Sequence, residues 1–303
     1  MLRWDLTCFA LVALLVIAGP TRGQIPVATG RTIALSNPAW SLFIPSDYQS
    51  RGAVADLIVH FHGDPATFRN NAKYARLNAI IVTVNYGGLS SAYQTPFQND
   101  TGLFNSLLSE AQAKVRAEPD FADNLVFDRL AVSSFSAGYG AVREVLKQQA
   151  YYNAIDMILA ADTIHAGFVS FPGNLALVSS QMTDWRRFAS DAAAGNKTFL
   201  VTHSQVDPVT YASTTLTAND LIGHVGAAAQ PYNVNGLGTL NFYRRAQTGG
   251  FMVLGATGAD ADSHLEHLRY IGEFLEDLPI AKVPEPAGMG LLAGGAALMR
   301  RRR

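Results

Sequence analysis

Residues 128–146 read DRLAVSSFSAGYGAVREVL, and this stretch decides the fold. A short apolar run at residues 130–132 meets a cluster of small residues, and apolar residues at helical spacing begin at Val142. The order predicts a strand, a sharp turn and a helix, with Ser136 at the turn. A serine-rich loop without chemistry is the alternative interpretation of the same letters.

Small residues stand two positions to either side of Ser136, namely Ser134 and Gly138. A turn this sharp puts its central residue in a strained backbone conformation, so the neighbours must be small to avoid the strand and the helix. The Ser136 side chain would then project above the sheet edge. The amide of Ala137, at the helix start, would point toward the group that the serine attacks. The stretch resembles the nucleophile elbow of the alpha/beta-hydrolases, with Ser134 in place of the usual first glycine.

The rest of residues 24–282 alternates strand-like and helix-like segments without an internal repeat or linker. Residues 54–62 and 79–85 are nearly all apolar, as buried parallel strands are. Further strands are expected at 32–35, 41–44, 155–161, 198–202, 240–245 and 250–255, and helices at 66–78, 101–118, 184–194, 217–229 and 263–277. Residues 87–100 and 230–238 are expected to be loops. Alternation at this spacing predicts one domain of α/β class, with a doubly wound, mostly parallel sheet.

A serine needs a base to take its proton, and the base needs a carboxylate to fix its tautomer. In the alpha/beta-hydrolase family these follow the serine in the order acid, histidine. His264 comes just after the last expected strand and is the preferred base, and His267 is the alternative. Asp207 lies a few residues beyond the strand at 198–202, and Asp162 directly follows the strand at 155–161. Both acids remain candidates.

The oxyanion of such a reaction needs two converging amides. Ala137 supplies one, and the His-Phe-His-Gly-Asp run at residues 60–64 resembles the His-Gly motif that supplies the other. Gly63 would let the backbone approach the substrate oxygen, and the amide of Asp64 would contribute the second donor.

Metal binding is the alternative for two groups of residues, the histidine pair at 60 and 62 and the cluster Asp260, Asp262, His264 and His267. No other His/Asp cluster has the regular ligand spacing of a zinc motif, and a structural or oxyanion-loop role is preferred for His60 and His62, so we expect no metal and no cofactor. The segment 209–249, which carries three tyrosines, is a candidate lid over the site.

The two ends of the chain have their own character. Residues 1–23 combine Arg3, an apolar run and small residues, which is typical of a secretory signal peptide, with a membrane anchor as the alternative. Residues 283–303 begin Val-Pro-Glu-Pro, continue with a 13-residue apolar run and end in four arginines. This order resembles the PEP-CTERM sorting tail of bacteria. It implies transient membrane contact, a sorting protease as partner and a destination at the cell surface or outside the cell.

The charge and the cysteine content bear on the possible partners and on the function. The 303-residue chain has a net charge of −1 and no basic stripe, which argues against nucleic acid as a partner. Its single cysteine, Cys8, lies in the expected signal peptide, so the mature chain would have no disulfide. The sequence therefore predicts a secreted or surface-sorted serine hydrolase acting on a small-molecule or polymer ester. A peptidase, a polysaccharide deacylase and a catalytically silent binding protein are the alternatives.

Overall fold

The structure is a computed structural model in which residues 24–284 are described. The expected signal peptide at 1–23 lies outside these residues, as does all but the start of the expected sorting tail at 283–303. No helix within residues 24–284 is long and apolar enough to cross a membrane.

The fold is built around a central sheet, and its strands alternate with helices along the chain. The strands are β1 (Gly30–Ala34), β2 (Trp40–Pro45), β3 (Val54–Phe61), β4 (Ala79–Val84), β5 (Val126–Phe135), β6 (Met157–Ala161), β7 (Phe168–Ser170), β8 (Asn174–Leu177), β9 (Thr198–His203), β10 (Gln230–Asn235), β11 (Asn241–Thr248) and β12 (Phe251–Ala256). The helices are α1 (Pro65–Tyr74), α2 (Ser90–Asn99), α3 (Leu103–Arg116), α4 (Tyr139–Leu146), α5 (Gln149–Ala154), α6 (Ser179–Ala193), α7 (Thr214–His224), α8 (Ala261–Arg269) and α9 (Gly272–Leu275), with a 3₁₀ turn at Ser136–Gly138.

Ten of the strands form one sheet in the order β1-β2-β4-β3-β5-β6-β9-β12-β11-β10. The six strands from β4 to β12 in this order are parallel to their neighbours. Antiparallel strands extend the sheet at both edges. The predicted doubly wound, mostly parallel α/β sheet in a single domain is therefore confirmed.

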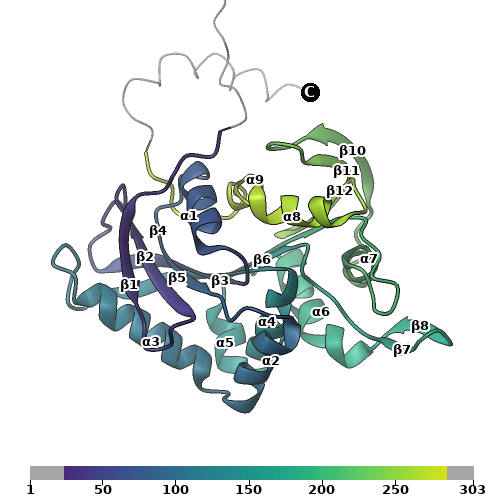
Figure 1. Cartoon of the computed structure of the whole chain (residues 1–303), viewed down its shortest axis with the longest axis horizontal. Coiled ribbons are helices and arrows are strands. Elements are labelled where there is room, and N and C mark those ends of the chain that lie inside the picture. Colours follow the sequence, from purple (N-terminus) through teal and green to yellow (C-terminus); the bar gives the residue numbers. More distant parts are fainter. Residues whose placement is uncertain (1–23, 285–303) are drawn as a thin grey trace, which may run out of the picture.

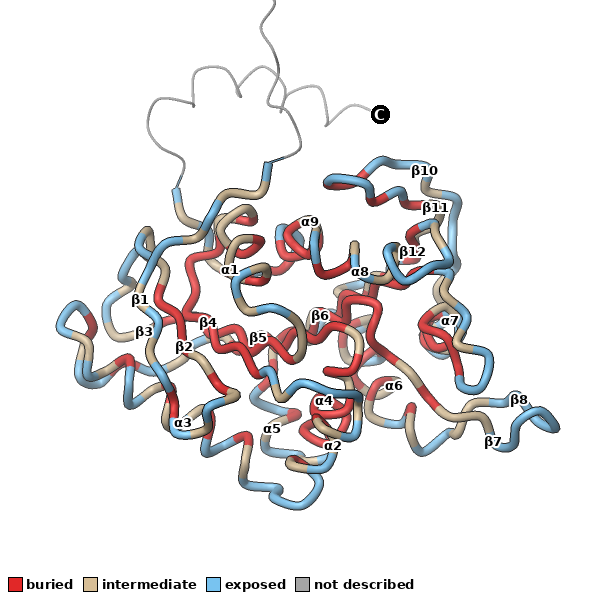
Figure 2. The backbone as a smooth tube through the Cα atoms, viewed as in Figure 1, coloured by how far each residue is buried: buried red, intermediate tan, exposed pale blue. Residues whose placement is uncertain are grey.

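Helices cover both faces of this sheet (Figure 1), with α1, α8 and α9 on one face and α2 to α6 on the other. Alternation along β3 shows why: Leu57 and Val59 pack into the core on the α3 and α4 side, and Ile58 packs into the core beneath α1 and α9. Both faces of the central strands are therefore buried, as the red segments in Figure 2 show. This burial explains the continuous apolar runs in the sequence.

Four stretches differ from the sequence expectations. Residues 90–99 form helix α2 inside the expected loop at 87–100, and 230–235 form edge strand β10 inside the expected loop at 230–238. Residues 168–177 form the hairpin β7–β8, which the sequence did not predict. The candidate lid at 209–249 contains α7 and the antiparallel strands β11 and β10, of which β10 forms the edge of the sheet.

Candidate active site

Backbone strain gathers at the carboxyl edge of the central strands. Among residues 24–284, five residues other than glycine have a positive φ, and three of these directly follow adjacent parallel strands. They are His62 after β3 (φ 71°), Ser136 after β5 (φ 46°) and Asp162 after β6 (φ 43°). Each such conformation costs about 1–3 kcal/mol and persists where the surroundings fix it, which is typical of functional sites.

The elbow at Ser136 is held by close packing. A Cβ atom at Gly138 would lie 2.3 Å from the carbonyl oxygen of Phe61, so the helix start touches the neighbouring strand directly. Ser134 is fully buried beneath the turn. Thr163 donates a hydrogen bond from Oγ1 to the Ser136 carbonyl at 2.7 Å. The small residues that the sequence placed two positions from Ser136 are thus small because strand and helix leave no space.

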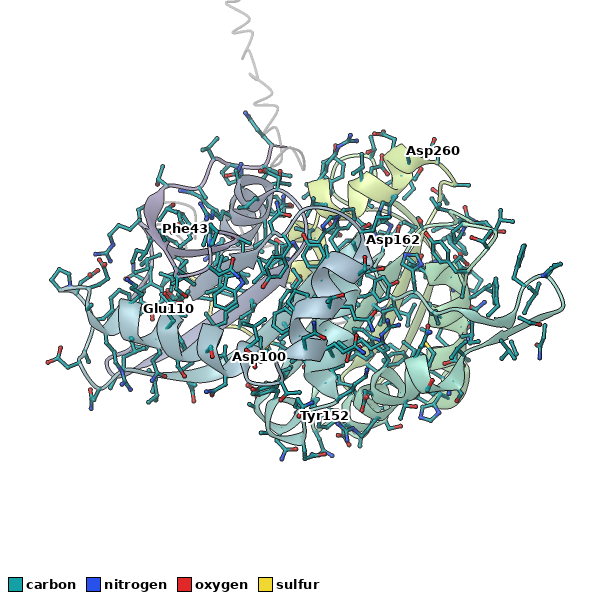
Figure 3. The ribbon with its side chains drawn as sticks, turned by 60° about the horizontal axis from the view of Figure 1, so that its bottom comes forward. Phe43, Asp100, Glu110, Tyr152, Asp162 and Asp260 are labelled. Carbon is teal, nitrogen blue, oxygen red and sulfur yellow. The ribbon has the colours of Figure 1, made fainter. Side chains whose placement is uncertain are left out.

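Asp162 is 1% exposed and accepts hydrogen bonds from three donors. Its Oδ1 accepts from the Ser204 amide at 2.9 Å and from the Thr214 hydroxyl, and its Oδ2 accepts from His264 Nδ1 at 2.6 Å. Figure 3 shows Asp162 within the body of the molecule, whereas Asp260 lies at the periphery. Burial opposes ionisation of this carboxyl group, but nearby His267, the bond to His264 and the Thr214 hydroxyl outweigh it and lower its pKa below the usual range. Asp162 is therefore a carboxylate.

His264 is positioned by the start of α8. Asp260 caps this helix by accepting hydrogen bonds from the amide and hydroxyl of Ser263 at 2.8 and 2.6 Å. The His264 ring stacks on Phe135 with a centroid distance of 4.6 Å, and Phe135 is the residue directly before Ser136. Because Asp162 accepts a hydrogen bond from Nδ1, that nitrogen carries the proton and Nε2 keeps its lone pair.

The structure separates the two candidate acids. Asp207 is exposed, and its carboxylate accepts a hydrogen bond from the Val209 amide at 2.9 Å within its own turn. His264 bonds to Asp162 instead. His267, the alternative base, is fully buried with its Nδ1 bonded to the Thr202 hydroxyl at 2.7 Å, and burial lowers its pKa.

The loop after β3 contributes backbone amides beside the elbow. A Cβ atom at Gly63 would lie 2.7 Å from the Leu268 side chain, and the residue has a φ of 112°, so glycine is required on both counts. The Asp64 carboxylate caps α1 by accepting from the amide and hydroxyl of Thr67. Among residues 24–284, neither the Gly63 amide nor the Asp64 amide has a hydrogen-bond acceptor.

His62 lies on the same loop and packs against the site. Its ring stacks on Phe135 at 6.0 Å, and its Nδ1 lies 2.8 Å from the Tyr93 hydroxyl, which donates to Asn85 at 2.9 Å. Burial, aided by nearby His264, lowers the pKa of His62. The single Tyr93 proton points to Asn85, so His62 Nδ1 donates to the Tyr93 hydroxyl.

Several contacts at the site were not predicted from the sequence, namely those of Ser204, Thr214 and Thr163. The one signal for Thr214 is its place after Ser213, which caps α7 by accepting from the Leu216 amide. Small polar residues before a helix indicate a cap, but they do not reveal which distant carboxylate the next hydroxyl meets.

Within residues 24–284, no three side chains of His, Cys, Asp or Glu come together as metal ligands would. Asp262 pairs with Arg269 at 2.6 Å, and His60 is buried, with its Nδ1 3.0 Å from the Ser133 hydroxyl. Both clusters considered as metal ligands thus have other partners.

No protein-family model and no curated protein matches this chain. Among solved structures, it is similar to a ferulic acid esterase from Anaeromyces mucronatus, with 12% identity, a TM-score of 0.47 and coverage of 83% of this chain and 91% of that chain. It is also similar to an acylaminoacyl peptidase from Pyrococcus horikoshii, with 14% identity, a TM-score of 0.45 and coverage of 87% of this chain and 43% of that chain. Likenesses this distant carry no information on activity, so the chemistry rests on this chain's own geometry.

Proposed function

We propose that this protein is a serine hydrolase that cleaves carboxylic esters, with Ser136 as nucleophile, His264 as base and Asp162 as the orienting acid. The observation that carries the proposal is the 2.6 Å bond between His264 Nδ1 and Asp162, made by an imidazole that stacks on the residue before the strained Ser136. This bond leaves Nε2 free to accept a proton.

The reaction follows from these positions. Ser136 Oγ attacks the ester carbonyl carbon while His264 Nε2 takes the serine proton. The amides of Ala137 and Asp64 stabilise the oxyanion, and the close backbone approach at Gly63 brings the second amide near. The bond to the alcohol breaks as His264 returns the proton to the leaving oxygen. Water then attacks the acyl-enzyme by the same route and releases the acid.

Asp162 supplies the electrostatic half of this mechanism. Its carboxylate stays ionised because hydrogen bonds and neighbouring histidines lower its pKa. It therefore stabilises the imidazolium that forms on His264 when the serine proton is transferred. The electrostatic attraction between a carboxylate and an imidazolium is strongest where water is excluded, and Asp162 is almost fully buried.

The test is hydrolysis of p-nitrophenyl butyrate by the wild type and by two alanine variants. We expect Ser136→Ala to lose activity by a factor on the order of 10⁴ or more. Ser134→Ala is the matched control, because this serine is two residues away and buried beneath the turn, and it should keep most of the rate. A folded Ser136→Ala protein with wild-type turnover would reject Ser136 as the nucleophile, and a folded wild-type protein without turnover would favour a binding protein.

We also propose that the protein is exported and directed to the cell surface by its carboxyl-terminal tail, which contacts the membrane until a sorting protease acts on it. The last described residues support this arrangement: Arg76 holds the Val283 carbonyl at the end of α1, and Leu77 pairs with Lys282. These contacts lie beside the amino end of β4, at the sheet edge opposite Ser136. A tail fixed to a surface would therefore leave the candidate site facing outward. Loss of cell-surface labelling on deletion of residues 283–303 is the expected result, and unchanged labelling would contradict it.

A further inference from the structure

Exposed apolar side chains are concentrated at the edge of the sheet that carries Ser136. Eleven large apolar side chains in residues 24–284 are exposed. Eight of them follow the carboxyl ends of parallel strands, in the connecting segments or early helical turns: Leu89, Val169, Phe171, Leu175, Val209, Tyr211, Leu216 and Leu265. Single exposed apolar residues need no explanation, but a concentration at one edge marks a binding surface.

The hairpin β7–β8 contributes three of these side chains, and it projects from the body of the molecule (Figures 1 and 3). Val169 is 58% exposed, Phe171 48% and Leu175 56%. We call this hairpin, Phe168–Leu177, the apolar arm. Its own sheet has only two strands, so nothing in the central core explains its apolar surface.

The apolar arm is connected directly to the candidate site. It begins six residues after Asp162, and its base pairs with the segment before α7 through Ala166 and Ala212, whose amide donates to the Ala166 carbonyl at 2.9 Å. Val178 closes the other side of the base by donating to the Gly167 carbonyl at 2.8 Å. The arm is thus anchored at the strand end that holds the acid.

An aromatic wall continues from the arm's base to the elbow. Tyr139, one helical turn after Ser136, meets His165 edge to face at 5.5 Å, and His165 meets Tyr211 at 5.3 Å. Because His165 Nδ1 lies 3.1 Å from the Ala212 carbonyl, that nitrogen carries the proton, and burial lowers the His165 pKa. The three rings thus form a continuous aromatic surface, with the Arg143 guanidinium carbon 5.3 Å from the Tyr139 ring centroid.

Two segments that form most of this surface contain no charged side chains. Residues 163–183, which include the arm, and residues 208–219, which include Tyr211, have no Asp, Glu, Lys or Arg. Along these two segments a charged substrate would find no ionic partner, whereas an apolar substrate would displace water without removing a charged side chain from water. The surface is complementary to an uncharged, apolar ligand larger than a single ester group.

We propose that the apolar arm and the aromatic wall dock a water-insoluble, uncharged ester, presented as a droplet or solid surface, so that Ser136 reaches its ester bonds. This inference rests on the proposed serine hydrolase function and names its substrate class. Each arm side chain that leaves water adds favourable transfer free energy, and together the three give the protein affinity for the apolar phase. A second copy of this chain is the competing occupant.

The experiment compares two triple variants. The arm variant carries Val169→Ser, Phe171→Ser and Leu175→Ser. The control variant carries Val27→Ser, Val126→Ser and Val234→Ser, which are also exposed but lie outside the apolar arm and outside the segments that follow the parallel strands. For each we measure the ratio of the hydrolysis rate on a tributyrin emulsion to the rate on dissolved p-nitrophenyl acetate. We expect the arm variant to lower this ratio by about tenfold or more and the control variant to leave it within about twofold.

A second measurement does not depend on catalysis. Ser136→Ala protein is mixed with triacylglycerol droplets, and the fraction that floats with them is compared with and without the arm substitutions. Loss of flotation when the arm is changed supports the docking role. This holds even if Ser136→Ala keeps its hydrolytic activity, a result that would reject only the serine mechanism. Equal flotation and an equal rate ratio would overturn the docking role. So would sedimentation showing a dimer that the arm variant dissociates while flotation is unchanged.

Discussion

Replacing Asp162 with asparagine should stop catalysis without disturbing the fold, and the contacts explain why. Asp162 Oδ1 accepts from Ser204 and Thr214, so the asparagine carbonyl must occupy that position. Its NH₂ group then faces His264 Nδ1, where the carboxylate accepted a hydrogen bond. Because an amide NH₂ only donates, Nδ1 must become the acceptor and the ring proton must move to Nε2.

An imidazole protonated on Nε2 cannot take the serine proton, so Asp162→Asn should lower kcat for p-nitrophenyl butyrate by about 10⁴. Asp207→Asn is the matched control. Its turn bond to Val209 can be made equally by an asparagine oxygen, and the residue is exposed. We expect it to keep kcat within about twofold.

The assay is steady-state hydrolysis at pH 7, with thermal unfolding of each variant to show that it is folded. A full rate in Asp162→Asn, or a larger loss in Asp207→Asn than in Asp162→Asn, would refute the assignment of the acid. Equal rates in all three proteins would refute the triad even if Ser136 were reactive.

Two further predictions concern stability and the elbow. Burial above all lowers the pKa of His60 and of His203 to about 3, against about 6.5 in the unfolded chain. Below pH 6.5 the unfolded state binds more protons than the folded state. The free energy of unfolding should therefore fall as pH decreases toward 3, by up to about 1.4 kcal/mol per pH unit for each histidine. His60→Asn should reduce this pH dependence in urea titrations, and an unchanged pH dependence would contradict the prediction. Gly138→Ala should destabilise the protein by roughly 2 kcal/mol and lower ester hydrolysis, because its Cβ meets the Phe61 carbonyl. Gly223→Ala, where nothing lies within 4 Å, should stabilise by up to about 1 kcal/mol in thermal unfolding, and the reverse order would reject the close packing at the elbow.

The sheet could be predicted because its central strands are buried on both faces. Such strands are continuous apolar runs, and β3 and β4 were located within one residue at each end. The elements that were missed carry weaker signals. Helix α2 is rich in polar residues and contains Pro96, strand β10 is mostly exposed, and the strands of the apolar arm have only three and four residues.

The candidate site was only partly predictable. Ser136 could be predicted from local sterics, because a sharp turn requires small neighbouring residues and the sequence shows them. The candidate acid could not be predicted in this way. Asp162 and Asp207 both follow strands, so the local sequence does not distinguish them. What separates them is the path of the chain after β9, which returns the Ser204 amide to Asp162 and leaves Asp207 in its own turn. That path depends on tertiary contacts such as the bond from the Gln205 amide to the Gly258 carbonyl at 2.8 Å.

The reactivity of Ser136 can be measured directly with a fluorophosphonate, which forms a bond from the serine oxygen to phosphorus and releases fluoride. Peptide mass spectrometry of the labelled wild-type protein should find one adduct, on Ser136, and labelling should be much slower in Asp162→Asn. An adduct on another residue, or no adduct on folded protein, would contradict the proposed catalytic mechanism.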